Sequence, residues 1–180
     1  MRHIFRIFVL VCATFSMTAC TGGVMPKFSL RTIEDTERRA NDTCEGKDRC
    51  VILYVAPWCP ICHRNVAFFR ELRRQLDGAP RVGVNYIVGN DRLMACEEFA
   101  TEIGGKVFLD SRDEFEKISS FSSVPHFWVI DRERKILEDF SWTGSHDSDV
   151  NGAVRSFIEK DLELGEFVPE RRVTYKEQNL

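Results

Sequence analysis

The chain has 180 residues, enough for one domain with terminal appendages, and 43% of them are apolar, which suffices for an ordinary hydrophobic core. Its formal net charge is −3 and its lysines and arginines form no cluster, which argues against nucleic-acid binding. Seven cysteines, together with the export signal described next, indicate an oxidising compartment.

Residues 1–19 have the pattern of an export signal, because a basic start precedes an apolar stretch and small residues follow it. The apolar stretch, 7–15, is too short to span a bilayer. Met17-Thr18-Ala19-Cys20 resembles the lipobox of bacterial lipoproteins, in which the cysteine is lipidated. Ordinary cleavage and a retained N-terminal anchor are the alternatives. The lipobox resemblance implies a membrane lipoprotein that faces the periplasm through an anchor on Cys20, and Thr21 favours the outer membrane over the inner one.

Residues 20–49 are polar and are predicted to form a tether, with a short helix over 33–41 that lacks a strong apolar face. Cys44 and Cys50 bracket five polar or charged residues. Their spacing permits a small disulfide loop just before the first central strand. The alternative is that Cys50 packs as a small apolar residue.

A buried strand is predicted over 51–55, because the run is apolar and rich in β-branched residues. A helix over 60–76 follows after a short break, and Pro60 suits its first turn because a proline lacks the N–H that would have no partner there. Cys59 therefore lies at the start of a helix, where free N–H groups stabilise a thiolate. Cys62, three residues on, lies close enough to close a disulfide with it.

Strands and helices alternate along the rest of the domain, which is predicted to span 50–164. Strands are predicted over 82–88, 107–109, 127–130 and 136–142, and helices over 92–103, 110–118 and 147–159. This alternation indicates an α/β fold with parallel crossovers. Cys96 falls inside a predicted helix and is expected to be a free thiol without a catalytic role. Residues 165–180 are charged and lack a clear period, so we expect a loose tail.

Trp58-Cys59-Pro60-Ile61-Cys62, at a strand-to-helix junction, resembles the active site of the thioredoxin superfamily. This resemblance implies a thioredoxin-like fold, with a central mixed β-sheet flanked by helices. It also implies that Cys59 attacks a disulfide and Cys62 resolves the intermediate. Val124-Pro125 precedes a predicted strand and matches the cis-proline segment that faces the CxxC in this superfamily. Trp58, Pro60, Ile61, Val124 and Pro125 would accordingly support the active site and dock the substrate.

The interval between Cys59 and Pro125 is longer than a minimal thioredoxin requires. An inserted helix-and-strand unit there resembles the extracytoplasmic TlpA-like reductases, many of them membrane-tethered, and the resemblance covers about 50–159. Leu53 and Asn65 occupy positions where such relatives carry acidic proton relays, so the proton path is left open. His63 lies four residues after Cys59 on the same helical face and is either a stabiliser of the thiolate or an exposed polar residue.

The resemblance implies a thiol-disulfide oxidoreductase that acts on thiols or disulfides of exported proteins, uses a redox partner protein and needs no cofactor. The direction of transfer stays open, because Val124 is similar to some oxidant members whereas the inserted unit resembles reductants. Residues 59–63 also match the CxxCH motif that attaches c-type haem, with His63 as an axial ligand. A metal site built from Cys59, Cys62 and His63 would need a fourth ligand such as His126. The strand before the motif and the Val124-Pro125 segment favour the redox function, for which no metal is expected.

Overall fold

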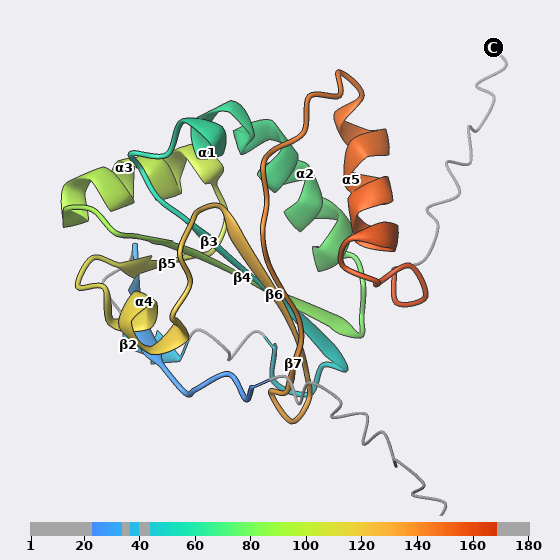
Figure 1. Ribbon diagram of the computed structural model, residues 1–180, viewed down its shortest axis with the longest axis horizontal. Coiled ribbons are helices and arrows are strands. Elements are labelled where there is room, and N and C mark those ends of the chain that lie inside the picture. Colours follow the sequence, from blue (N-terminus) through green and yellow to red (C-terminus); the bar gives the residue numbers. More distant parts are fainter. Residues whose placement is uncertain (1–22, 34–36, 40–43, 169–180) are drawn as a thin grey trace, which may run out of the picture.

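The computed structural model describes residues 23–33, 37–39 and 44–168 (Figure 1). The export signal over 1–19 and the lipidation site predicted at Cys20 lie outside the described residues. Among the described helices, none is both long and apolar enough to cross a membrane.

The described strands form one mixed sheet in the order β2-β1-β5-β4-β3-β6-β7. They are β1 (Ser29–Thr32), β2 (Glu37–Arg39), β3 (Arg49–Val55), β4 (Val82–Gly89), β5 (Val107–Asp110), β6 (His126–Asp131) and β7 (Ile136–Ser141). The three central strands β3, β4 and β5 run parallel, and the remaining pairs are antiparallel. The sheet and its helices confirm the predicted thioredoxin-like α/β fold.

Helices cover both faces of this sheet. They are α1 (Pro60–Arg64), α2 (Val66–Asp77), α3 (Leu93–Ile103), α4 (Glu114–Ser119) and α5 (Val150–Lys160). Side chains of α1, α2, α3 and α5 belong to the core on one face, whereas α4 packs on the other face with the segment that leads into β1 (Figure 1). The chain therefore has two hydrophobic cores separated by the sheet.

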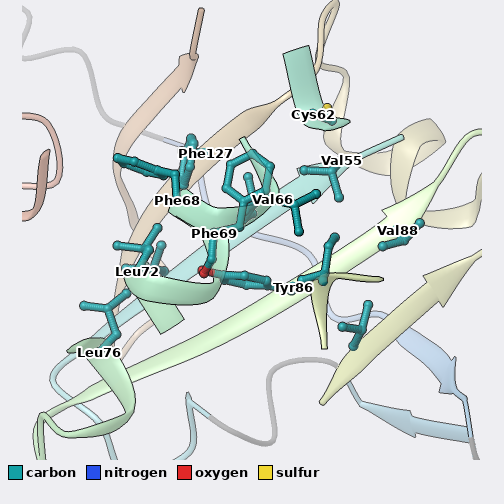
Figure 2. Close-up of a cluster of buried hydrophobic side chains, with 14 of the residues drawn as sticks. Val55, Cys62, Val66, Phe68, Phe69, Leu72, Leu76, Tyr86, Val88 and Phe127 are labelled. Carbon is teal, nitrogen blue, oxygen red and sulfur yellow. The ribbon is translucent and has the colours of Figure 1, made fainter. Parts of the chain in front are cut away.

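The strand that leads to the CxxC contributes to both cores. Val51, Leu53 and Val55 face the α2 side, while Ile52 and Tyr54 face the α4 side, as the alternation of a strand requires. Because both faces are covered, β3 is apolar along nearly its whole length. On the α2 side, the helix buries Val66, Phe68, Phe69, Leu72 and Leu76 against the sheet (Figure 2). The CxxC thus follows a strand whose side chains are packed in both hydrophobic cores.

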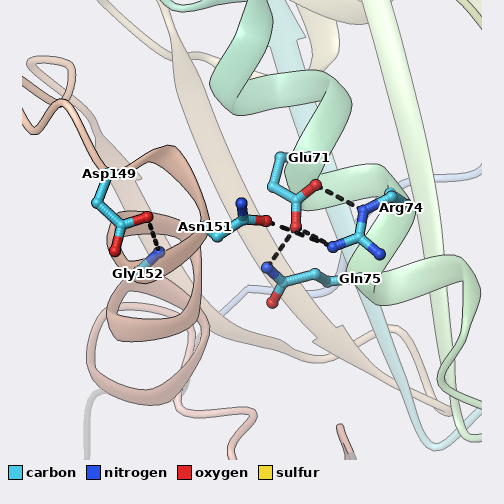
Figure 3. A network of polar contacts seen from close by, with 6 residues as sticks. All are labelled: Glu71, Arg74, Gln75, Asp149, Asn151 and Gly152. Carbon is cyan, nitrogen blue, oxygen red and sulfur yellow. Dashed lines mark hydrogen bonds and ion pairs between the residues drawn. The ribbon is translucent and has the colours of Figure 1, made fainter. Parts of the chain in front are cut away.

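A polar network joins the outer surfaces of α2 and α5 (Figure 3). The Nε of Arg74 donates to Glu71 at 2.6 Å, and its Nη2 lies 3.5 Å from the Oδ1 of Asn151. Asp149 caps α5 by accepting the N–H of Gly152 at 3.1 Å. Exposed ion pairs contribute little stability, so we expect this network to add little to the packing of α2 against α5 in the core.

The prediction of a polar tether over 20–49 is wrong for much of that segment. Met25, Phe28 and Leu30 are buried in the core on the α4 side, and β1 pairs antiparallel with β5. The predicted helix over 33–41 is also wrong, because residues 37–39 form β2, which pairs with β1. Short strands at or next to the edge of a sheet need only a few buried side chains, and such a short pattern is easily hidden by its polar neighbours.

Two further boundaries differ from the prediction. The helix expected over 60–76 is divided at Asn65, where the backbone turns to φ −110° and ψ 16°. The tail expected to be loose from residue 165 is still ordered at Phe167, which is buried. The guanidinium carbons of Arg49 and Arg81 each lie 4.8 Å from the centre of the Phe167 ring, and these contacts hold the segment against the domain.

Candidate active site

The two cysteines of the CxxC meet at the start of α1. Cys59 is the N-cap residue of that helix, and its sulfur accepts a hydrogen bond from the backbone N–H of Cys62 at 3.1 Å. Both residues are free thiols, and both are buried. A sulfur that accepts an N–H hydrogen bond is stabilised as a thiolate, so this geometry favours Cys59 as the attacking nucleophile.

Cys62 has a different environment although it lies only three residues away. Its side chain is 0% exposed, and this burial raises the pKa of the Cys62 thiol well above its ordinary value, with the hydrogen bond to Cys59 acting in the same direction. Cys62 therefore remains a protonated thiol before Cys59 reacts. This asymmetry matches the roles of attacking and resolving cysteine.

The Val124-Pro125 segment lies directly against Cys59. The Val124 carbonyl accepts a hydrogen bond from the Cys59 thiol at 3.5 Å, and the peptide bond between Val124 and Pro125 is cis. Pro125 in turn is tied to the following strand pair, because its carbonyl accepts the N–H of Trp142 at 2.9 Å. The structure therefore brings together two segments that are far apart in the sequence, as the resemblance implied.

Other predicted residues surround this pair. Trp58 is 55% exposed, although its indole Nε1 donates to the carbonyl of Asn90 at 2.8 Å, which fixes the ring beside the CxxC. Ile61 and Val124 are half-buried at the edge of the core on the α2 side. These three side chains form an apolar rim close to the sulfurs, of the kind that can contact an incoming polypeptide.

The structure does not bring His63 to the sulfur of Cys59, in contrast to one of the two predictions for it. Its Nε2 lies 2.5 Å from the carbonyl of Pro57, and its Nδ1 lies 3.5 Å from Glu102. The imidazole ring also packs on Phe99, with ring centres 4.5 Å apart. Both ring nitrogens therefore face groups other than the thiol, and His63 links α1 to α3.

The two positions without an acidic residue differ from each other. Leu53 is buried in the core on the α2 side, whereas Asn65 is a buried polar residue with both ends of its amide in use. Its Nδ2 donates to the carbonyl of Ile61 at 2.8 Å, and its Oδ1 accepts the N–H of Ser145 at 3.0 Å. Asn65 therefore ties the CxxC helix to the loop after β7. In the sequence, the signal for this role was an asparagine at a position where the apolar pattern of the predicted helix calls for an apolar residue.

The same loop contains Gly144, a position at which the structure requires a glycine. Gly144 has φ +96°, and a Cβ at this position would lie 2.7 Å from the Nδ2 of Asn65. A larger residue would therefore be strained and would push the amide away from Ile61. Close approach of the loop to α1 depends on both residues.

The geometry does not support the metal site considered above. His126 contacts Asp139 and Ser141 rather than the CxxC. Within the described part of the chain, no group of three or more histidine, cysteine, aspartate or glutamate side chains is placed to hold a metal ion. As an axial haem ligand, His63 would also have to leave Pro57, Glu102 and Phe99.

The other described cysteines are Cys44, Cys50 and Cys96. Cys44 and Cys50 form the disulfide that their spacing permitted, with Cα atoms 5.4 Å apart, at the opposite end of β3 from the CxxC. Cys96 is a buried free thiol whose sulfur lies 3.5 Å from the carbonyl of Asp91. Burial raises the pKa of Cys96 to about 12, which leaves little reactive thiolate at neutral pH.

The chain is similar in sequence to known proteins. The model of the Redoxin family matches residues 21–154. A curated relative, the mitochondrial thioredoxin domain-containing protein C13F5.05 of Schizosaccharomyces pombe, is 27% identical over 141 residues, which are 76% of this chain and 38% of the relative. This chain therefore spans well under half of that relative's length.

Solved structures share the fold at low sequence identity. The thioredoxin domain of a thiol-disulfide oxidoreductase from Bacteroides vulgatus superposes with a TM-score of 0.59 at 16% identity, covering 77% of this chain and 97% of that one. The exposed lipoprotein thioredoxin of Streptococcus pneumoniae superposes with a TM-score of 0.56 at 16% identity, covering 74% of this chain and 99% of that one.

Proposed function

Because the chain belongs to the Redoxin family and is a thiol-disulfide oxidoreductase of the thioredoxin superfamily, we propose that it exchanges disulfides in exported proteins through Cys59 and Cys62. The observation that supports this role most directly is the asymmetry of the two thiols. The Cys59 sulfur accepts the Cys62 N–H at 3.1 Å and faces Val124, whereas the Cys62 thiol is fully buried behind it.

The reaction follows from this arrangement. The Cys59 thiolate attacks one sulfur of a substrate disulfide, the substrate S–S bond breaks, and the departing sulfur leaves as a thiolate that takes up a proton. Cys62 then loses its proton and attacks the Cys59 sulfur, which releases the second substrate thiol. The enzyme is left with a Cys59–Cys62 disulfide, and two electrons have passed to the substrate. A redox partner protein of dithiol type would return these electrons.

The same steps run backwards oxidise a substrate dithiol. The net direction depends on the reduction potential of the Cys59–Cys62 pair relative to that of the compartment. Equilibration of the protein with defined ratios of reduced and oxidised glutathione measures this potential. A value close to that of thioredoxin would assign a reductant, and a much less negative value would assign an oxidant.

The test of the proposed function is the reduction of a disulfide-bonded protein driven by dithiothreitol. The full chain should accelerate this reduction, and a Cys59→Ser/Cys62→Ser double variant should leave it at the uncatalysed rate. Cys96→Ser is the matched control, because it removes a buried free thiol outside the site and should retain the wild-type rate. Acceleration by the double variant would contradict the assignment of these two cysteines.

We further propose that the protein is anchored by lipid on Cys20 and faces the periplasm, with the outer membrane favoured. The support is the lipobox-like Met17-Thr18-Ala19-Cys20 sequence after an apolar stretch too short to span a bilayer. A protein described as an exposed lipoprotein thioredoxin, from Streptococcus pneumoniae, shares this fold. An anchor would hold the CxxC close to the membrane, within reach of newly exported chains.

Replacement of Cys20 by Ser should abolish acylation and shift the protein from the membrane to the soluble fraction, because stable anchoring requires acyl chains on that residue. Fractionation of cells together with mass spectrometry of the mature N-terminus measures both effects. Cys44→Ser serves as a control cysteine substitution that should leave the acylation unchanged. A wild-type protein without lipid on Cys20 would contradict the proposal.

A further inference from the structure

A buried histidine follows the Val124-Pro125 segment and has no role in the exchange reaction described above. His126 is the first residue of β6, and only 6% of its surface is exposed. Its ring packs against two aromatic rings, with centres 4.3 Å from Trp128 and 5.3 Å from Phe121. These contacts on the α4 side hold the imidazole in one orientation.

The imidazole belongs to a hydrogen-bonded series of four polar side chains. Its Nε2 lies 2.6 Å from the Oδ1 of Asp139, and its Nδ1 lies 3.0 Å from the hydroxyl oxygen of Ser141. The Ser141 oxygen lies 2.5 Å from the hydroxyl oxygen of Ser123. Two neighbouring strands and the segment before Pro125 are therefore joined through His126.

The direction of these hydrogen bonds follows from the chemistry of the groups. A carboxylate can only accept, so Nε2 carries the hydrogen and donates to Asp139. In the neutral ring Nδ1 must then accept, and the Ser141 hydroxyl donates to it. Ser123 donates to Ser141 in turn, so both hydroxyls of this series donate in the direction of His126. Hydrogen bonds aligned in this way strengthen one another.

The far end of this hydrogen-bonded series is one residue away from the contact with Cys59. Ser123 precedes Val124, whose carbonyl contacts the Cys59 thiol at 3.5 Å. Residues 121–124 belong to no helix or strand, and within the described part of the molecule their backbone groups form no hydrogen bond to other backbone groups. The hydroxyl of Ser123 therefore adds a polar tie between this segment and β7, next to the backbone bond from Trp142 to Pro125.

We propose that His126 is a positioning residue that fixes Val124 beside Cys59 through Ser141 and Ser123, and thereby sets the affinity for an extended polypeptide substrate. This inference rests on the proposed function. The Val124 carbonyl lies 3.5 Å from the Cys59 sulfur, so a polypeptide attached there can contact the Val124 backbone, whereas a small disulfide needs only the sulfur. Loosening the segment should therefore weaken the docking of polypeptides and leave the reaction with small disulfides unchanged.

Ser123→Ala removes the last hydroxyl of the hydrogen-bonded series. The residue is exposed, so this substitution tests the inference without a risk to folding. It should raise KM for a disulfide-bonded polypeptide about fivefold at unchanged kcat, the size expected from one hydrogen bond. Ser123→Thr retains the hydroxyl and should restore the wild-type KM. The reaction with glutathione disulfide should not change in either variant.

Two substitutions of His126 separate its two nitrogens. His126→Gln keeps a donor for Asp139 near the position of Nε2, but its amide oxygen does not occupy the position of Nδ1 that Ser141 contacts. It should therefore raise KM about as much as Ser123→Ala. His126→Asn places an acceptor near Ser141 and should retain more of the wild-type affinity. The double variant Ser123→Ala/His126→Gln should have a KM no higher than that of either single variant, because both substitutions interrupt the same hydrogen-bonded series.

A rise in KM confined to polypeptides, restored by Ser123→Thr, supports the inference. An unchanged KM in Ser123→Ala, or an equal loss with glutathione disulfide, overturns it while wild-type turnover leaves the proposed function intact. A wild-type protein that reduces neither substrate overturns the proposed function itself, and this inference with it.

Discussion

Replacement of Cys62 by Ser is expected to abolish turnover and to leave about one substrate molecule covalently attached to each protein molecule. Cys59 retains its hydrogen bond from the backbone N–H of residue 62, so the first attack still occurs. The mixed disulfide then persists, because the hydroxyl of serine cannot displace the substrate sulfur. Mass spectrometry of the non-reduced adduct identifies both its stoichiometry and the cysteine that carries it.

Controls distinguish this mechanism from adventitious disulfide formation. Cys59→Ser should form no adduct, since the thiol of Cys62 is fully buried. Cys96→Ser in the Cys62→Ser background should leave the adduct unchanged, because Cys96 is buried and its pKa is raised to about 12. An adduct carried by Cys96, Cys44 or Cys50 would show that a different cysteine reacts.

The resolving step should also depend on pH in a defined direction. Burial raises the pKa of the Cys62 thiol above its ordinary value of 9.0, and only its thiolate attacks. Below that raised pKa, the rate of resolution should increase about tenfold per pH unit, which single-turnover kinetics on the preformed mixed disulfide can measure. A rate independent of pH between about 6 and 8 would contradict this protonation state.

The same shift links the redox state to stability. The folded protein binds the Cys62 proton more tightly than the unfolded chain does, so this proton stabilises the folded, reduced protein at pH values below 9.0. This contribution should be lost as the pH rises above 9.0, the value for an unperturbed thiol. The oxidised form has no such proton, and its stability should not show this dependence.

Phe127→Ala is expected to lower the free energy of unfolding by about 3–5 kcal/mol, the largest effect on stability that we predict. Phe127 is 0% exposed, and it lies among the aromatic side chains of the core on the α2 side (Figure 2). Its ring centre is 4.9 Å from that of Phe157 and 5.7 Å from that of Phe140. Truncation would leave a cavity between β6 and α5 that rigid neighbours cannot fill.

Urea denaturation monitored by circular dichroism measures this loss. Leu137→Ala on β7 is the matched control, because that side chain is 38% exposed, and its truncation should cost less than about 1 kcal/mol. A folded protein has only about 5–15 kcal/mol of stability in total, so the Phe127 variant should unfold at a markedly lower urea concentration. Equal midpoints for the two variants would contradict the tight packing of Phe127 between β6 and α5.

Much of the active site could be predicted from the sequence, because its signals are local. The apolar strand, the break at Trp58 and the proline-containing helix start lie within fifteen consecutive residues, 51–65, and each depends on neighbouring side chains. The alternation of strands and helices predicted the fold class for the same reason. The Val124-Pro125 segment was identified by family resemblance, since a central strand tolerates a proline only at its very start.

The tertiary structure decided what depends on residues far apart in the chain. Asn65 bonds Ser145, and His126 bonds Asp139 and Ser141, yet neither partner is marked by any local pattern. The same holds for β1, whose few buried side chains gain their meaning only beside β5. Sequence periodicity reports which face of an element is apolar, whereas a polar contact depends on the folded geometry of two elements at once. For this protein, the sequence alone indicated the pair of cysteines that we propose to react, and only the folded structure decided how the residues around them are held.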